Sequence, residues 1–280
     1  MARKPIIIAV TSDQHCGSTV ALCPPTIALD DGGTYDASKA QRWLWDSWQD
    51  FWQRVADRRR AHKATLIQVF NGDLVEGAHH QSTQVLSGNP TAQAAVVNET
   101  LRIPLALKPN HLFFIRGTEA HVGPSAAFEE RIAIGLAKDK RPVVREEATG
   151  NGSHWHARLD VQGCRFDFAH HGRMGQRPWT KGNVVLNLAA EIFYTHAAAE
   201  RPHPHLAVRS HLHQFFDTQG AHPTRLIQTP AWQLATAYIH RLAPGAIADV
   251  GGLIILVDGG RFTVEPVLYR PDAPAAWRVA

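Results

Sequence analysis

An aspartate and a histidine stand two residues apart near the start of the chain, directly behind a short apolar run. The run covers residues 6–10, and the pair is Asp13 and His15. A carboxylate and an imidazole at this spacing can bind a divalent cation, and an imidazole can also act as a general acid or base. One such pair is common in surface loops, so its meaning depends on how the other apolar runs end.

Four further apolar runs also end in carboxylates or imidazoles. Each run is short and bounded by turn residues, which is typical of a buried strand. In α/β proteins, ligands bind at the carboxyl ends of the strands. We therefore expect these side chains to converge on one site. They are Asp73 and Glu76 after residues 66–70, Glu119 and His121 after 112–115, His170 and His171 after 164–169, and His211 and His213 after 206–208.

These residue types suit a pair of divalent metal ions. Two cations a few ångströms apart repel, so a carboxylate has to bridge them and further anionic or imidazole groups have to surround them. Oxygen and nitrogen ligands without thiolate suit Mn, Fe or Zn rather than a purely structural zinc site, and of these we expect two Mn²⁺ ions. The negative charge would come from Asp13 and Asp73, and the neutral nitrogens from His15, His171, His211 and His213.

The order of these groups resembles the calcineurin-like metallophosphoesterase family. The signatures of that family run Asp-x-His, Gly-Asp-x-x-(Asp/Glu), Gly-Asn-His-(Asp/Glu), His-Gly and Gly-His-x-His. The resemblance covers residues 8–213, and although each motif alone is weak, five in this order are specific. The close matches are Asp13 with His15, Gly72-Asp73 with Glu76, His171-Gly172, and His211 with His213, where Ser210 replaces the usual Gly.

The resemblance implies both a fold and a reaction. The fold is a four-layer αββα sandwich of the α/β class, in which two mixed β-sheets are flanked by helices. The reaction is hydrolysis of a phosphate ester at two divalent metal ions, with a hydroxide between the ions attacking phosphorus in line. By resemblance, one ion is held by Asp13, His15, Asp73 and His213, and the other by Asp73, Glu119, His171 and His211.

One signature departs from the family pattern. Where the family has Gly-Asn-His, this chain has Gly117-Thr118-Glu119-Ala120-His121. By resemblance we assign the ligand role of the Asn to Glu119, and the protonation of the leaving group to His121. The alternative places Thr118 at the ligand position, with Glu119 facing the substrate.

The expected substrate is a phosphodiester of the nucleotide or nucleic-acid type. Arg173, which follows His171-Gly172, is the candidate clamp for the phosphate, and Arg116 is its rival. The alternatives are a phosphomonoesterase or protein phosphatase of the same fold, and a non-catalytic scaffold with this fold that binds partners. A scaffold is expected to have lost ligands, whereas at least six of the seven are present here.

Composition and periodicity predict one domain that spans residues 1–280. Apolar residues make up 44% of the chain and charged residues 19%, which is typical of a compact globule. Asp36 or Ser38 is expected to cap the first helix. Helical patterns alternate with the apolar runs at residues 37–60, 91–107, 125–139 and 183–199, and a hairpin is expected at 251–269.

Several features bear on location and partners. The formal charge of +4 is mild, and no apolar run approaches the ~18–20 residues of a membrane span. Three scattered cysteines fit a reducing compartment, so we expect a cytoplasmic protein with no membrane partner. Trp45 or Trp52 is a candidate subunit contact in a homo-oligomer. His79 and His80 are expected to be exposed loop histidines, with substrate contact as the alternative.

Overall fold

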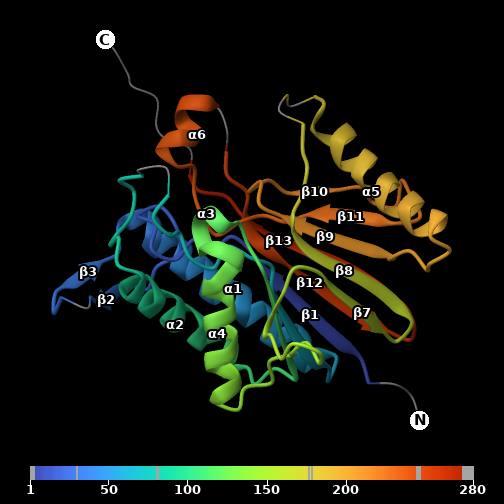
Figure 1. Ribbon diagram of the computed structural model, residues 1–280, viewed down its shortest axis with the longest axis horizontal. Helices are drawn as coiled ribbons and strands as arrows, with labels where there is room; N and C mark the ends of the chain where they lie inside the picture. Colours follow the sequence, from blue (N-terminus) through green and yellow to red (C-terminus); the bar gives the residue numbers. More distant parts are fainter. Residues whose placement is uncertain are drawn as a thin grey trace.

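Two β-sheets pack face to face, and helices cover the outer face of each sheet (Figure 1). The computed structural model describes residues 4–29, 31–79, 82–175, 177, 179–243 and 247–272. His80, which we expected in an exposed loop, lies outside the described residues. None of the helices in these ranges combines the length and the apolar composition that a membrane span requires.

The first sheet has six strands in the order β13-β12-β1-β4-β5-β6. Strands β1, β4, β5 and β6 are parallel, and β12 pairs antiparallel with both β1 and β13. The carboxyl ends of β1, β4 and β5 therefore lie at one end of the sheet. The strands are β1 (Ile6–Thr11), β4 (Thr65–Phe70), β5 (His111–Ile115), β6 (Ser153–His154), β12 (Val250–Asp258) and β13 (Arg261–Tyr269).

The second sheet has five strands in the order β10-β11-β9-β8-β7. Its three central strands are parallel, and β10 and β7 pair antiparallel at the two edges. The strands are β7 (Ala157–Val161), β8 (Cys164–His171), β9 (Leu206–Ser210), β10 (Phe216–Asp217) and β11 (Arg225–Gln228). A separate two-stranded sheet consists of β2 (Thr26–Ala28) and β3 (Thr34–Asp36).

Helices lie on both sides of the pair of sheets. In Figure 1, α1, α2 and α4 lie on the side of the first sheet, and α5 lies on the far side of the second. The short helices α3 and α6 lie at the upper end of the sheets in this view. The helices are α1 (Lys39–Ala61), α2 (Pro90–Ala106), α3 (Glu119–Val122), a 3₁₀ turn (Pro124–Ala126), α4 (Ala127–Lys138), α5 (Lys181–Ala198) and α6 (Ala237–Leu242).

Alternation along the strands explains the four layers. In β1, Ile7 and Ala9 pack in the cluster that contains the buried faces of α1 and α2. Ile8 and Val10 point to the opposite face and pack in the cluster shared with β8, β9 and β11 of the second sheet. This is the period of two expected of a strand whose two faces are both buried. The predicted four-layer αββα sandwich is confirmed.

The long predicted elements are present, as are the short strands β5 and β9, while several other short elements were missed. The missed elements β2, β3, β7, β10, α3 and α6 have six residues or fewer, too few to show a hydrophobic period. Ser38 rather than Asp36 caps α1, because its hydroxyl accepts a hydrogen bond from the Gln41 backbone N–H. Trp52 is only 1% exposed in the core, so it does not mark a subunit contact.

Candidate metal centre

Backbone hydrogen bonds join the loops that follow β1 and β4. The Asp13 N–H donates to the Gly72 carbonyl at 2.9 Å, and the His15 N–H donates to the Asp73 carbonyl at 3.0 Å. These bonds continue the parallel pairing of the two strands beyond their ends. Asp13, His15 and Asp73 are consequently held in one fixed arrangement, and each is at most 1% exposed.

Five of the predicted ligands have a left-handed backbone conformation. A positive φ is uncommon for residues other than glycine and costs of order 1–3 kcal/mol, so it persists only where the surroundings enforce it. Such conformations cluster at functional sites. Two of the five, His211 and His213, belong to the segment after β9, so this segment does not continue the extended strand. The five are Asp13 (φ 54°), His15 (φ 44°), Asp73 (φ 54°), His211 (φ 77°) and His213 (φ 52°).

The first group of donors consists of Asp13, His15 and His213. The Nε2 atoms of His15 and His213 lie 3.1 Å apart. His213 Nε2 lies 3.3 Å from Asp13 Oδ1, and His15 Nε2 lies 4.0 Å from Asp73 Oδ2. Asp13 Oδ1 is buried, and no hydrogen-bond donor within the described ranges satisfies it. An unsatisfied buried carboxylate oxygen facing two imidazole nitrogens fits a divalent cation.

The second group consists of Asp73, His170 and His211. His170 Nε2 lies 2.9 Å from Asp73 Oδ2, and His170 Nδ1 lies 2.7 Å from the Asn71 carbonyl oxygen. That carbonyl can only accept, so it keeps a proton on Nδ1 and turns Nε2 towards Asp73. Asp73 thus faces both groups of donors, as a bridging carboxylate would.

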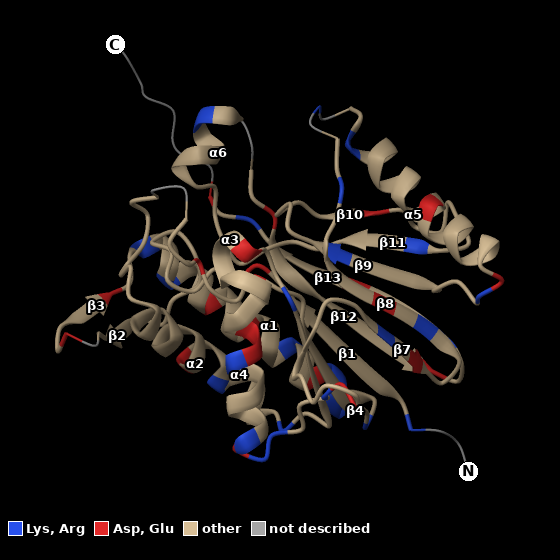
Figure 2. Cartoon of the chain, viewed as in Figure 1, with Lys and Arg blue, Asp and Glu red and all other residues tan. Residues whose placement is uncertain are grey.

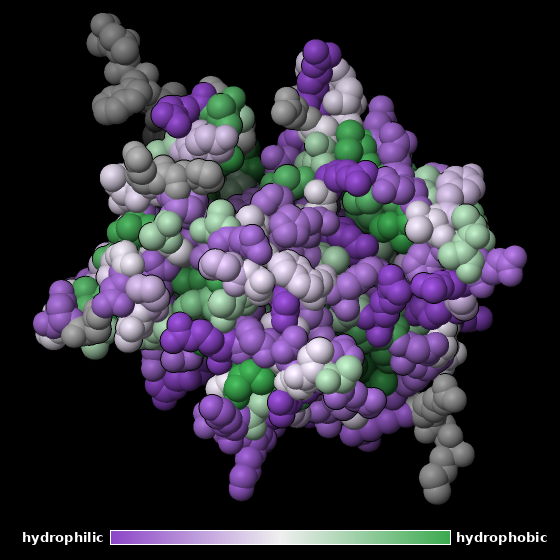
Figure 3. All heavy atoms as spheres, in the orientation of Figure 1, coloured by the Kyte–Doolittle hydropathy of each residue, from purple (hydrophilic) through white to green (hydrophobic). Residues whose placement is uncertain are grey.

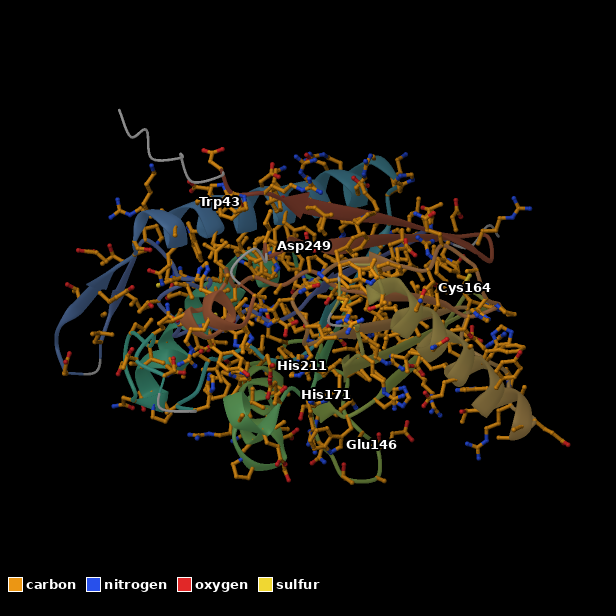
Figure 4. All side chains as sticks on the ribbon, turned by 90° about the horizontal axis from the view of Figure 1, so that it is seen from above. Trp43, Glu146, Cys164, His171, His211 and Asp249 are labelled. Carbon is orange, nitrogen blue, oxygen red and sulfur yellow. The ribbon has the colours of Figure 1, made fainter. Side chains whose placement is uncertain are left out.

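His171 lies beside the second group. Its ring centroid is 5.1 Å from that of His211, and Figure 4 shows the two side chains next to each other. The bulge between Phe168 and His171 interrupts the regular alternation at the end of β8. The structure therefore brings both His170 and His171 to the site, whereas we had selected only His171 as the ligand.

Of the residues after β5, Thr118 faces the two groups of donors, whereas Glu119 faces the solvent. The Thr118 hydroxyl lies 3.1 Å from His211 Nδ1 and 3.4 Å from His171 Nε2, and the Thr118 N–H donates to Asp73 Oδ1 at 2.6 Å. Glu119 is exposed, and its carboxylate accepts a hydrogen bond from the Ser125 N–H. Of the two alternatives at the ligand position, the geometry favours Thr118.

Neither arginine considered as a phosphate clamp is directed at the two groups of donors. Arg173 pairs with Glu191 of α5 at 2.7 Å, and Figure 2 shows acidic colouring on this helix. Arg116 donates to the Ser153 hydroxyl and lies over the ring of Trp155. Among the described residues, no Lys or Arg forms an ion pair with Asp13 or Asp73. Within the described ranges, histidines are the only basic side chains that pair with these two carboxylates.

The electrostatics keep both carboxylates ionised. Burial by itself would raise the pKa of Asp13, but His170 and His213 outweigh it and lower the pKa to about 2. The pKa of Asp73 is lowered further, because the effect of His170 and His15 exceeds that of burial. Burial by itself would lower the pKa of His170, but Asp73 and Asp13 raise it to about 10. The raised pKa of a buried imidazole indicates a negative electrostatic potential at this site, and a negative potential favours the binding of cations.

Comparison with known proteins gives similarities in structure but none in sequence. No family model matches the chain, and no curated protein matches it. Vacuolar protein sorting 29 from Cryptosporidium parvum matches with 7% identity and a TM-score of 0.46, over 96% of this chain and all of that chain. A dimetal phosphatase from Danio rerio matches with 8% identity and a TM-score of 0.43, over 93% and 95% of the two chains. A 5′-nucleotidase from Candida albicans matches with 12% identity and a TM-score of 0.45, over 96% of this chain and 52% of that one.

Glu76 contacts His15 through Nδ1, the ring nitrogen that does not face the first group of donors. Its Oε2 lies 2.9 Å from His15 Nδ1 and accepts a hydrogen bond of 2.9 Å from Gln233, while its Oε1 lies 3.0 Å from His79 Nε2. Burial opposes ionisation of Glu76, but His15 outweighs it and lowers the pKa to about 2. A carboxylate behind a histidine fixes the ring orientation and raises the basicity of the nitrogen that faces the metal.

Replacement of Glu76 by Gln is therefore expected to weaken metal binding. We expect the affinity for Mn²⁺ to fall at least about tenfold, the range seen for carboxylates that support metal-bound histidines. Calorimetric titration with Mn²⁺ measures this change, with the exposed Glu147→Gln as the matched control. An unchanged affinity in the Glu76 variant would show that His15 does not depend on this contact.

His121 lies at the edge of the site. Its ring contacts His15 at 4.5 Å and His79 at 4.2 Å between centroids, and its Nδ1 lies 2.9 Å from the Glu76 carbonyl oxygen. Burial and the neighbouring His15 lower the pKa of His121 to about 4. The role of acid for the leaving group stays a prediction. His79 also reaches the site, with only 17% of its side chain exposed, so it is not an exposed loop residue.

Glu129 is a fully buried acid in the first turn of α4. Its Oε1 accepts a long hydrogen bond of 3.5 Å from the Leu74 N–H, next to Asp73. Burial, with the added charge of Asp73, raises its pKa to about 8. The folded chain therefore disfavours the ionised form of Glu129 at neutral pH.

This shift predicts a loss of stability as the pH rises. Because the pKa in the folded state exceeds the ordinary glutamate value of 4.5, the folded state binds more protons between pH 4.5 and about 8, and stability falls across that window. Relative to Glu129→Gln, we expect the wild type to lose roughly 2–4 kcal/mol of unfolding free energy from pH 5 to pH 8. Urea denaturation at both pH values measures it, and Glu147→Gln should follow the wild type. Parallel behaviour of the wild type and Glu129→Gln would contradict the prediction.

Proposed function

We propose that this chain is a metal-dependent phosphodiesterase of the calcineurin-like metallophosphoesterase family. Its reaction would convert a phosphodiester and water into a phosphomonoester and an alcohol. The observation that supports the proposal best is the pair of buried carboxylates, Asp13 and Asp73, which face five imidazoles without a Lys or Arg partner among the described residues. When bound, divalent metal ions would supply Lewis acidity to the phosphoryl group and lower the pKa of water.

The geometry supports two adjacent positions for the metal ions. The first would be held by Asp13, His15 and His213, and the second by His170, His171 and His211. Asp73 would contribute to both, because its Oδ2 faces His15 as well as His170. The residues that fix these donors are part of the same arrangement: the Thr118 N–H holds Asp73 Oδ1, and Glu76 holds His15.

The charge of the site favours a diester over a monoester. A phosphomonoester carries close to two negative charges at neutral pH, and enzymes that bind such dianions commonly use Arg or Lys clamps. Here Arg173 and Arg116 are engaged elsewhere. A diester carries a single negative charge, which metal ions can balance without such a clamp.

The function is tested by turnover of two substrates with one leaving group. With Mn²⁺ we expect kcat/KM for bis(4-nitrophenyl) phosphate to exceed that for 4-nitrophenyl phosphate at least about tenfold. Chelation should abolish both activities, and added Mn²⁺ should restore them. Preference for the monoester would favour a phosphomonoesterase. No turnover of either ester, by protein shown to contain metal, would favour the non-catalytic scaffold.

The ligand position after β5 has its own test. Thr118→Val keeps the shape of the side chain but removes the hydroxyl that faces His211. We expect it to weaken binding of the second Mn²⁺ about tenfold. Glu119→Gln, one residue further on, should leave the affinity within about twofold. Calorimetric titration distinguishes the two, and the reverse ranking would restore Glu119 as the ligand.

A further inference from the structure

A large pocket opens from the metal centre. It has a volume of about 890 Å³, and its inner end contains His15, Asp73, His211 and His213. Pockets of about 300–1,000 Å³ accommodate whole drug-sized ligands, so this one has room for far more than a phosphoryl group. The outer wall comes largely from the segment 233–241, which contains most of α6.

The outer wall exposes apolar side chains. Tyr238 is 58% exposed, Ile239 36% and Ile247 71%, and all three line the pocket. They are three of the seven large hydrophobic residues that are exposed in the described part of the chain. In Figure 3 hydrophobic (green) atoms lie beside hydrophilic (purple) ones at α6. An exposed apolar patch at the rim of a polar site is typical of a ligand-binding surface.

Backbone and side-chain hydrogen bonds connect the segment that forms the wall to the residues of the candidate metal centre. The Trp232 N–H donates to the carbonyl of Asp13 at 2.9 Å, and Gln233 donates to Glu76 at 2.9 Å. The start of α6 is held by a hydrogen bond of 2.7 Å from the Ala237 N–H to the Gln84 side chain. A group bound against α6 would therefore have a defined position relative to a phosphate at the metal centre.

The chemistry of the wall suits a flat ring. Tyr238 presents an aromatic face, and the guanidinium of Arg241 lies 5.9 Å from the centroid of that ring. Arg241 is the only Lys or Arg among the described residues that line the pocket. Aromatic rings stack on such a surface, and a planar guanidinium adds to the binding of π systems.

We propose that this wall, formed by Tyr238, Ile239, Arg241 and Ile247, binds an aromatic or heteroaromatic group on one arm of the phosphodiester. The inference rests on the proposed function, because the phosphodiester places the ring by binding at the metal centre. It names the substrate class: diesters with at least one aryl or nucleobase-bearing arm. Tyr238 is the specificity-determining residue.

The test uses two monoanions that cannot be hydrolysed. Methyl(phenyl)phosphinate and dimethylphosphinate have the same charge and the same two phosphoryl oxygens, and they differ only in the ring. In Mn²⁺-loaded protein we expect calorimetry to show that the phenyl compound binds about tenfold more tightly. Tyr238→Ala should reduce this ratio to about threefold or less, and Tyr238→Phe should retain it. Tyr194→Ala is the matched control, since Tyr194 is 65% exposed on α5 and is not part of the pocket lining.

The possible results distinguish a failure of the proposed role of the wall from a failure of the proposed phosphodiesterase function. Diester turnover together with equal affinities for the two phosphinates, or a ratio that Tyr238→Ala leaves unchanged, overturns the inference alone. Absence of both turnover and phosphinate binding overturns the proposed function as well. Sedimentation showing a dimer that Tyr238→Ala dissociates would assign the apolar wall to a second copy of the chain, and would also overturn the inference.

Discussion

Replacement of Asp73 by Asn is expected to lower kcat/KM for bis(4-nitrophenyl) phosphate at least about a thousandfold. The change removes a charge that faces both metal positions, and metal ions contribute several kcal/mol to the stabilisation of such a transition state. It also replaces one oxygen by an NH₂ group. Asp73 Oδ1 accepts from the Thr118 N–H and Oδ2 faces His170 Nε2, so the amide loses an acceptor in either orientation.

The same variant should bind less metal. We expect metal analysis to find two Mn²⁺ per chain in the wild type and one or fewer in this variant. Asp160→Asn is the matched control, because Asp160 is exposed on β7 and an amide oxygen can still accept the hydrogen bond from the Gly163 N–H. Full metal content and an unchanged rate in the Asp73 variant would refute the bridging role.

The convergence of the strand ends could be predicted from the sequence because it depends on local features. Short apolar runs predict parallel strands, and parallel strands bring the residues that follow them to one end of a sheet. Asp13 and Asp73 meet for this reason, through the pairing of β1 with β4. The four layers follow from the same alternation, since both faces of β1 are apolar.

The contribution of the segment after β5 depends on a helix that is too short to recognise. Successive residues of a helix are rotated by about 100°, so Glu119 and His121 point in opposite directions, while Thr118 and His121 share a face. The structure has this arrangement in α3, with Thr118 as its N-cap and its hydroxyl turned to the histidines. The sequence left Thr118 and Glu119 as alternatives because no apolar period marks these four residues as a helix.

Other features of the site depend on contacts between distant segments. The approach of His170 to Asp73 depends on a bulge in β8. No pattern in the sequence predicts this bulge. Arg173 is drawn towards Glu191, a partner eighteen residues further along the chain. The pocket wall on α6 lies next to the loop that contains Gln84, more than 150 residues earlier. Such proximity follows from tertiary packing rather than from local propensity.

Replacement of Gly117 by Ala is expected to lower kcat/KM for the diester at least about a hundredfold, although it adds only a methyl group. A Cβ at position 117 would overlap both the backbone nitrogen and the carboxylate of Asp73. The backbone of Asp73 is held by its bond to His15, so relief of the overlap has to move the carboxylate away from the metal positions. A displacement of about 1 Å at a catalytic group can cost a factor of a hundred.

Gly135→Ala is the matched control for this substitution. Gly135 lies within α4, and a Cβ there would meet nothing within 4 Å, so the rate should be unchanged and the helix slightly stabilised. Metal analysis of Gly117→Ala should show a loss of Mn²⁺ alongside the loss of rate, because one overlap disturbs both. Normal activity with full metal content would mean that the loop after β5 can shift away from Asp73, and that the close approach of these two segments is not required for the site.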